Sequence, residues 1–170
     1  MVRRIRADEG PELRAIRLQA LRDSPAAFSS SLAREARQPA GGWDAAASRR
    51  CAGDHEATFV ALDGEEWVGM VGAYRPLGSR SVVELVSLWT APAARRRGVG
   101  AALVERVVAW AGTPYTSAVQ LWVSRDNEGA RRFYEALGFR ETGAPVVAAP
   151  GPCRDELRMG ISVLSPTVAR

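Results

Sequence analysis

The chain has 170 residues, of which 46% are hydrophobic and 25% charged, with a formal net charge of +4 and an isoelectric point near 9.8. This composition excludes a disordered chain and predicts one domain over residues 1–170 with a single buried core. The basic balance favours an anionic partner, although charge alone does not separate a phosphorylated cofactor from nucleic acid or a membrane surface. All basic residues are arginines, which excludes any mechanism that needs a lysine of this chain.

Apolar patterns and turn residues predict the elements in chain order. We expect a strand at 2–7, a helix at 9–22, a weaker helix near 30–50, strands at 57–62, 66–74 and 82–90, a helix at 99–111, a strand at 118–124, a helix at 127–137, a strand near 138–142 and a last strand at 155–163. The segment LDGEEW predicts a hairpin turn through Asp63 and Gly64. The fold class is therefore α/β (α+β mixed): a single mixed, mostly antiparallel sheet of six to seven strands with helices on both faces.

Two stretches have the least regular patterns, from Ser24 to Trp43 and from residue 143 to residue 153. They are either plain surface loops or the walls of a substrate cleft, because loops on a rigid sheet often carry specificity. The start MVRRIRADEG has no apolar stretch behind its charges, and the longest uncharged run, 107–123, is broken by Gly112 and Pro114. We therefore expect a cytoplasmic protein with no membrane partner.

Cysteine and histidine offer little chemistry in this sequence. Cys51 and Cys153 are far apart and lack metal-ligand spacing, so we expect two reduced thiols and no metal site. His55, the only histidine, lies in the polar stretch GDHE and is expected in a loop. No Ser/His or Cys/His dyad is therefore in view.

The stretch LWTAPAARRRGVGAAL, residues 88–103, places three arginines and two glycines where a strand gives way to a helix. The N–H groups of a helix start lack internal partners and the helix dipole adds positive charge, so this turn is suited to bind an anion. The alternative is a solvated charge run, but three cations oppose the dipole there unless an anion neutralises them. A Walker loop needs a lysine, and a dinucleotide fingerprint needs a small residue where Leu103 stands; neither motif fits.

The remaining pattern resembles the acyl-CoA pyrophosphate loop of the GNAT superfamily of N-acetyltransferases, Q/R-x-x-G-x-G/A, at Arg95, Gly98 and Gly100. A second segment, SRDNEGARRFYEALGFRETG, resembles the family pattern N-x-x-A-x-x-F-Y-x-x-x-G-F. The matching positions are Asn127, Ala130, Phe133, Tyr134, Gly138 and Phe139. Asn127 suits a helix N-cap. Spacing alone would make the face of Ala130, Phe133 and Tyr134 ordinary core.

The resemblance implies acetyl-CoA as the acyl donor and no metal. It implies that the strands at 82–90 and 118–124 splay apart and that pantetheine binds the main chain of Leu88, Trp89 and Thr90 in the gap. The pyrophosphate would be held beside Arg95 by the main chain of the next six residues, with Asn127 on the opposite wall. These six residues are Arg96, Arg97, Gly98, Val99, Gly100 and Ala101.

The catalytic roles are also implied by the resemblance. Glu84 stands where some branches of the family carry a general base, and its neighbours Val83 and Leu85 suggest a burial that raises its pKa. Alternatively Glu84 is a solvent-facing strand residue and a water chain takes the proton. Tyr134 is the expected acid that protonates the departing thiolate of CoA, with direct transfer in a ternary complex.

Three hypotheses about the function follow from these observations. The first is an N-acetyltransferase acting on a primary amine of a small molecule or a peptide. The second is a catalytically inactive acyl-CoA-binding sensor of the same fold. The third, a basic nucleic-acid-binding domain, is disfavoured because the arginines are spread over nearly every segment and no nucleic-acid-binding motif emerges. The family resemblance also allows a homodimer, whereas the identity of the acceptor amine is not readable from the sequence.

Overall fold

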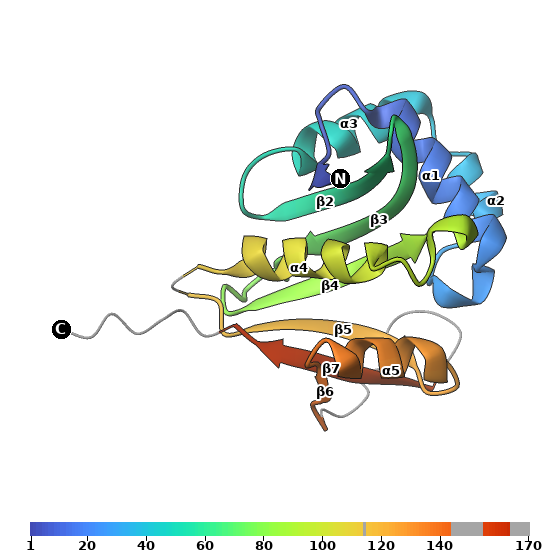
Figure 1. Ribbon diagram of the computed structural model, residues 1–170. Helices are drawn as coiled ribbons and strands as arrows, with labels where there is room; N and C mark the ends of the chain where they lie inside the picture. The colour runs from blue at the N-terminus through green and yellow to red at the C-terminus, as the bar shows by residue number, and fades with distance from the viewer. Residues whose placement is uncertain (114, 144–154, 164–170) are drawn as a thin grey trace.

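The computed structural model describes residues 1–113, 115–143 and 155–163. In this part of the chain one sheet has the strand order β1-β2-β3-β4-β5-β7-β6 (Figure 1). Its strands are β1 (Val2–Arg4), β2 (Glu56–Asp63), β3 (Glu66–Tyr74), β4 (Val82–Thr90), β5 (Ala118–Ser124), β6 (Arg140–Glu141) and β7 (Glu156–Ser162). All neighbours are antiparallel except β4 and β5, which run parallel. The expected mixed, mostly antiparallel sheet is therefore confirmed.

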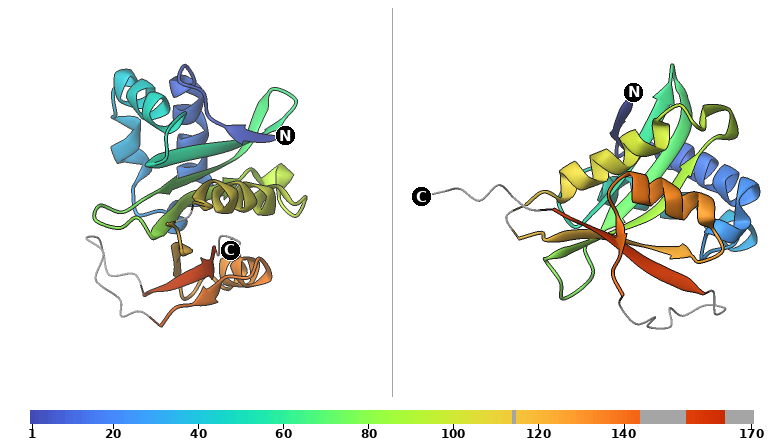
Figure 2. Two further views of the ribbon diagram at one scale, coloured as in Figure 1. Left: turned by 90° about the vertical axis from the view of Figure 1, so that its left-hand side faces the viewer. Right: turned by 60° about the horizontal axis from the view of Figure 1, so that its bottom comes forward.

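Helices cover both faces of this sheet. They are α1 (Gly10–Asp23), α2 (Leu32–Ala36), α3 (Ala40–Arg50), α4 (Val99–Ala111) and α5 (Glu128–Ala136), with short 3₁₀ turns at Pro25–Ala27 and Pro92–Ala94. Figure 2 shows α1, α2 and α3 on one side of the sheet and α4 on the other.

The region between α1 and β2 is more regular than the sequence predicts. The weak helix expected near 30–50 is two helices, because Pro39 is the N-cap of α3 and disfavours helical geometry in the residue before it. Ser31 begins α2, where its side chain accepts a hydrogen bond from the N–H of Arg34. The predicted irregular stretch from Ser24 to Trp43 is therefore wrong over most of its length.

Smaller differences concern the ends of strands. The first strand stops at Arg4, and β6 is only two residues long. The hairpin between β2 and β3 turns through Gly64 and Glu65, because Asp63 already pairs with Glu66. Gly64 has a φ of +61°, which glycine adopts without strain. Of the other predicted irregular stretch, 143–153, all but the first residue lies outside the described residues.

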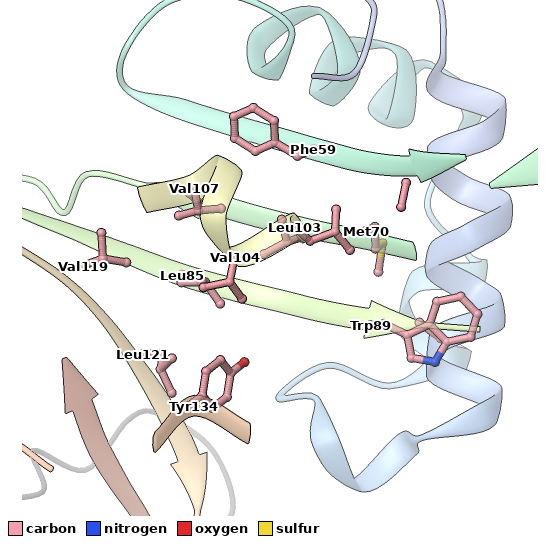
Figure 3. Close-up of a cluster of buried hydrophobic side chains, with 14 of the residues drawn as sticks. Phe59, Met70, Leu85, Trp89, Leu103, Val104, Val107, Val119, Leu121 and Tyr134 are labelled. Atoms are coloured by element: carbon pink, nitrogen blue, oxygen red, sulfur yellow. The ribbon is translucent and has the colours of Figure 1, made fainter. Parts of the chain in front are cut away.

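The main core lies between α4 and strands β2 to β5 (Figure 3). Leu103, Val104 and Val107 are each at most 2% exposed and form the face of α4 that meets the sheet. Gly69 in β3 allows the close approach, because a Cβ there would lie 3.0 Å from the Leu103 side chain. The helix that follows the arginine-rich segment is therefore held firmly, and its first turn has a fixed position over the sheet.

No described helix has the length and apolar character that a membrane span requires. Within the same residues, no cluster of three or more His, Cys, Asp or Glu side chains could hold a metal ion. Cys51 is a free thiol at the end of α3, and His55 is exposed in the connection to β2, as expected for a loop residue. Cys153 lies outside the described residues.

Candidate active site

A β-bulge interrupts β4 at the residues expected to bind pantetheine. The register with β3 shifts between Val86 and Trp89, so Ser87 and Leu88 together lie opposite a single β3 residue. Ser87 has a φ of +58°, which is uncommon for a residue with a side chain. The Nη1 of Arg17 in α1 donates a hydrogen bond to the Ser87 hydroxyl at 3.0 Å. Helix α1 therefore supports the bulge from the face opposite α4.

Strands β4 and β5 diverge soon after they begin. Their last paired residues are Glu84 and Gln120, although β4 continues to Thr90 and β5 to Ser124. Figure 1 shows the two ribbons separating along their length. Beyond Glu84 one edge of β4 has no strand partner within the described residues, and main-chain groups at such an edge need another hydrogen-bonding partner. The divergence that the family resemblance implied is present.

The arginine–glycine turn, residues 95–100, joins the end of β4 to α4. Gly98 is the N-cap of α4 with a φ of +80°, and a Cβ there would have no atom within 4 Å. Without a side chain, Gly98 cannot cap the helix, so the first-turn N–H groups are not satisfied in the usual way. Arg96 also has a positive φ, +61°. An exposed, uncapped helix start of this shape favours binding of an anion.

Arg95 is held by contacts to β4 and α1. Its Nε donates to the carbonyl oxygen of Thr90 at 3.0 Å, and its Nη2 forms an ion pair with Asp23 at the end of α1. Asp23 also accepts a hydrogen bond from the indole Nε1 of Trp89 at 2.9 Å. Hydrogen bonds from Ser24, Trp89 and Arg95, in that order, hold the pKa of Asp23 below its usual range. Asp23 thus ties α1 to both ends of the bend after β4.

The next two arginines differ from Arg95. Arg97 makes one ion pair, 3.4 Å long, with Asp63, and both side chains are about 60% exposed. Arg96 is exposed and makes no hydrogen bond or ion pair with the rest of the described chain. The positive charge available to a ligand at this turn therefore comes mainly from Arg96 and, after its weak pair opens, from Arg97.

Gly100 lies where α4 packs against α5. A Cβ at Gly100 would lie 3.2 Å from the ring of Phe133 in α5 and 3.7 Å from the Thr90 hydroxyl. The absent side chain therefore leaves room for the Phe133 ring, so close packing of α5 against the start of α4 also requires a glycine here. Gly98 remains the glycine that the turn itself requires.

Helix α5 begins with the predicted cap. The Asn127 Oδ1 accepts a hydrogen bond from the N–H of Ala130 at 3.1 Å. Because this oxygen is engaged, Asn127 would act on a ligand through its amide nitrogen, which is exposed with the rest of the side chain. Glu128 follows in the first turn, where a carboxylate suits the helix dipole.

Tyr134 is the buried residue of α5, with 8% of its surface exposed. Its ring makes edge contacts with Phe133 and Phe139, at centroid distances of 5.1 and 5.6 Å. Figure 3 shows the ring beside Leu121 of β5 and the hydroxyl pointing away from α5 towards β4. Burial raises the pKa of Tyr134 well above its ordinary value, so the phenol stays protonated at neutral pH.

Glu84 is buried, which excludes the solvent-facing alternative. Only 5% of the residue is exposed, and its Oε1 accepts a hydrogen bond from Nη2 of Arg158 in β7 at 3.0 Å. Burial raises the pKa of Glu84, and the positive charge of Arg158 opposes that rise. The carboxylate lies at the last point where β4 and β5 are paired, and its side chain is on the face opposite α4 and α5.

Two hollows flank these residues. A groove of about 730 Å³ runs between α4 and the edge formed by β1 and β2, and it reaches Arg97 and Gly98. A cavity of about 130 Å³ lies on the other face, between α1 and strands β2 to β4, and its lining includes Tyr74 and Ser87. Neither hollow lies in the gap between β4 and β5. The gap is recognised instead from the edge of β4, which has no strand partner beyond Glu84 within the described residues.

Sequence reasoning missed Asp23, Arg17 and Arg158. Asp23 and Arg95 are 72 positions apart, and Glu84 and Arg158 are 74 apart. Charged residues are frequent in this chain, and nothing local marks these particular ones. The only usable signal is the indole of Trp89, which needs a hydrogen-bond acceptor when buried.

The class of protein follows from these observations. Residues 18–139 match the model of the acetyltransferase (GNAT) family, and the mixed sheet, the split between β4 and β5 and the arginine–glycine turn agree with it. The chain belongs to this family.

Two archaeal proteins are similar in sequence to about half of the chain. The chain is 39% identical over 83 residues to an uncharacterized N-acetyltransferase of Methanocaldococcus jannaschii, covering 49% of this chain and 34% of the relative. It is 34% identical over 92 residues to an uncharacterized N-acetyltransferase of Archaeoglobus fulgidus, covering 51% of this chain and 62% of the relative. The matches thus span between a third and two thirds of these relatives' length.

Solved structures share the fold at low sequence identity. A GNAT acetyltransferase of Streptococcus pneumoniae superposes with a TM-score of 0.77 at 19% identity, covering 96% of this chain and 98% of that one. The structure of yncA from Salmonella typhimurium, solved with its cofactor acetyl-CoA, gives 0.75 at 18%, covering 100% and 97%. The ribosomal-protein-S18-alanine N-acetyltransferase of Escherichia coli gives 0.66 at 16%, covering 100% and 98%.

Proposed function

We propose that this protein transfers the acetyl group of acetyl-CoA to a primary amine by direct attack in a ternary complex. The observation that carries the proposal is the uncapped start of α4 at Gly98, placed directly after the strand whose edge is unpaired beyond Glu84. Family membership supports it, as does the structural neighbour solved with acetyl-CoA. A diphosphate at the helix start would place the rest of the cofactor along β4.

In this proposal the main chain holds the cofactor. The amides of Arg96 to Ala101 bind the diphosphate, and Arg96 and Arg97 add positive charge. Asn127 contacts the cofactor from the side of α5. Pantetheine lies along the unpaired edge of β4 and bonds to the main chain at Leu88, Trp89 and Thr90.

One of these β4 amides faces the thioester oxygen, which becomes negative as the amine attacks. A fixed donor at that point stabilises the transition state by about 3–4 kcal/mol. A bulge lies at Ser87 and Leu88. Because a bulge bends its strand locally, we propose that it turns such a donor towards the gap. Support of the bulge by Arg17 then serves to keep the donor aligned.

The acceptor amine must lose a proton before it attacks. An alkyl ammonium with a pKa near ~10.4 needs about 4–5 kcal/mol to reach its neutral form at pH 7. Glu84 is the proposed base: its carboxylate takes one ammonium proton, directly or through water. The nitrogen lone pair then forms a bond to the thioester carbon, and the carbonyl electron pair moves onto oxygen. The attached nitrogen releases its second proton to water. The carbon–oxygen double bond then forms again, and the carbon–sulfur bond breaks with its electron pair on sulfur.

Tyr134 is the proposed acid for the departing sulfur. The raised pKa keeps the proton on the phenol, and the same burial raises the pKa of a thiolate formed beside it. The phenol therefore donates a hydrogen bond to the developing thiolate and transfers its proton as negative charge accumulates. We expect Tyr134→Phe to lower kcat by about 10²–10⁴ while the affinity for acetyl-CoA stays close to that of the wild type.

The test combines binding with turnover. Acetyl-CoA should raise the melting temperature of the purified protein, whereas generic DNA at moderate salt should not, and thiol release should appear with a subset of a panel of amines and peptides. Tyr115→Phe is the matched control, because Tyr115 is 71% exposed in the connection from α4 to β5. A melting shift without thiol release from any acceptor would favour the sensor. Full turnover of Tyr134→Phe would refute the acid role.

A further inference from the structure

We propose that Glu84 and Arg158 together bind an acceptor that carries both an ammonium and a carboxylate, as a free α-amino acid does. The inference rests on the proposed function and adds the chemical class of the acceptor. We refer to the two residues as the acceptor pair. They come from β4 and β7 and meet across β5 on the face opposite α4 and α5.

The sheet places Arg158 where it can face a ligand. Arg158 pairs with Trp122 of β5, and its guanidinium carbon lies 4.6 Å from the centroid of the Trp122 ring. An aromatic face under a guanidinium holds the plane of the group without using its N–H donors. The side chain of Arg158 is 29% exposed, against 7% for Glu84, so the cation is the more accessible partner.

The acceptor pair also has unused hydrogen-bonding capacity. The contact between the two side chains joins one nitrogen, Nη2, to one oxygen, Oε1. The Nε of Arg158 is buried and has no hydrogen-bond partner among the described residues. A guanidinium pairs best with a carboxylate through two parallel N–H donors, which this single contact does not achieve. A ligand carboxylate would supply the missing acceptors.

The charges of the acceptor pair determine which kind of amine it binds best. The acceptor pair is neutral overall, but it presents a carboxylate and a cation side by side. An α-amino acid mirrors this arrangement: its ammonium meets Glu84 and its carboxylate meets Arg158. A polyamine or an alkylamine also offers an ammonium to Glu84, but it has no carboxylate for Arg158, which then gains no partner and repels the added positive charge.

The surroundings of the acceptor pair suit a small ligand. Tyr74 and Gln120 are the register partners of Glu84 on its two sides, so all three share one face. Tyr74 is 40% exposed and Val86, two residues after Glu84, is 38% exposed. Both line the cavity of about 130 Å³ beneath α1. This cavity can receive the side chain of the amino acid.

The experiment compares acceptors that differ only at the carboxylate. Thiol release from acetyl-CoA is measured with L-alanine, L-valine and L-leucine, with their carboxamides, and with the amines left when the carboxylate is removed. For at least one of the three sets we expect a kcat/KM for the acid about 10- to 100-fold above those of its amide and amine. Arg158→Gln should reduce that ratio to about one, and Arg158→Lys should keep part of it because the charge remains.

Arg132→Gln is the control, since Arg132 is an exposed arginine that pairs with Glu128 in α5, on the face opposite the acceptor pair. It should leave the ratio unchanged. Binding of acetyl-CoA is measured by the melting temperature. It distinguishes a failure of the proposed acceptor class from a failure of the proposed function. Equal rates with acids and amides, or a ratio that survives Arg158→Gln, would overturn the acceptor class, as would cofactor binding with no release from any of these acids. Loss of acetyl-CoA binding in the wild type would overturn the proposed function itself.

Discussion

The arginine–glycine turn and the acceptor pair serve the same proposed reaction, but their construction differs. The turn is a contiguous stretch of six exposed or half-buried residues whose proposed donors are main-chain groups. The acceptor pair consists of two side chains 74 positions apart, one of them almost fully buried. Any sequence that sets the same backbone conformation can reproduce the turn. The acceptor pair exists only because β5 lies between β4 and β7.

Substrate specificity should depend more on the acceptor pair than on the turn. Charges in the exposed turn are screened by salt, so replacing one of its arginines should change binding modestly. In the buried acceptor pair, removal of one partner leaves the other charge uncompensated, which has larger consequences. We therefore expect family-wide chemistry in the turn and acceptor preference in the acceptor pair.

The largest effect in this comparison should come from Glu84→Gln. Loss of the base should lower kcat by about 10²–10³, with the acetyl-CoA-induced melting shift retained. Glutamine keeps the shape and can still accept from Arg158, so folding should survive. Glu135→Gln, an exposed residue of α5, is a suitable control. Unchanged kcat in Glu84→Gln would show that water alone takes the proton.

The pH dependence of the rate and of the stability tests the same role of Glu84. Because burial raises the pKa of Glu84, the wild-type rate should fall on the acid side at a pH above the ordinary glutamate value of about 4.3, and Glu84→Gln should lack this limb. The folded state also holds this proton more tightly than the unfolded state. Glu84 therefore lowers stability as pH rises from the ordinary pKa through the raised one. Melting curves over that range should show Glu84→Gln without this loss.

Gly98→Val tests the turn and should come next in size. A β-branched residue at a φ of +80° costs about 1–2 kcal/mol or more and would shift the first N–H groups of α4. We expect the Kd for acetyl-CoA to rise by about 10-fold or more. Gly53→Val is the matched control, since Gly53 has a φ of +78° in the connection from α3 to β2, away from the turn. Equal acetyl-CoA affinity in both variants would contradict a main-chain diphosphate site.

The smallest effect should come from Asp23→Asn. Asparagine can still accept from Trp89 but no longer pairs electrostatically with Arg95, so the bend after β4 loosens. We expect a KM for acetyl-CoA about 2- to 5-fold higher and a loss of stability of about 1 kcal/mol or less, because the site is partly exposed. Steady-state kinetics at two salt concentrations would measure this. A changed preference between amino acids and their amides would contradict the assignment of cofactor binding to the turn and of acceptor preference to the acceptor pair.

Much of the fold could be predicted because its signals are local. The strands β2 to β5, the start of α4 at Val99 and the cap at Asn127 all follow from periodicity and turn residues within a few positions. The bulge could not be predicted, because Ser87 has a positive φ without the glycine that usually marks one. The contact between Gly100 and Phe133 could not be predicted either, since only the fold brings the two residues together.

The central claim is that main-chain amides at the start of α4 bind the diphosphate of coenzyme A. The most direct measurement is an amide ¹H–¹⁵N titration of the protein with coenzyme A and, separately, with pantetheine, which has no diphosphate. We expect the amide signals of Gly98, Val99 and Gly100 to shift strongly with coenzyme A and little with pantetheine, while the signals near Leu88 respond to both. If coenzyme A binds and the signals from Gly98 to Ala101 do not move, the account is contradicted.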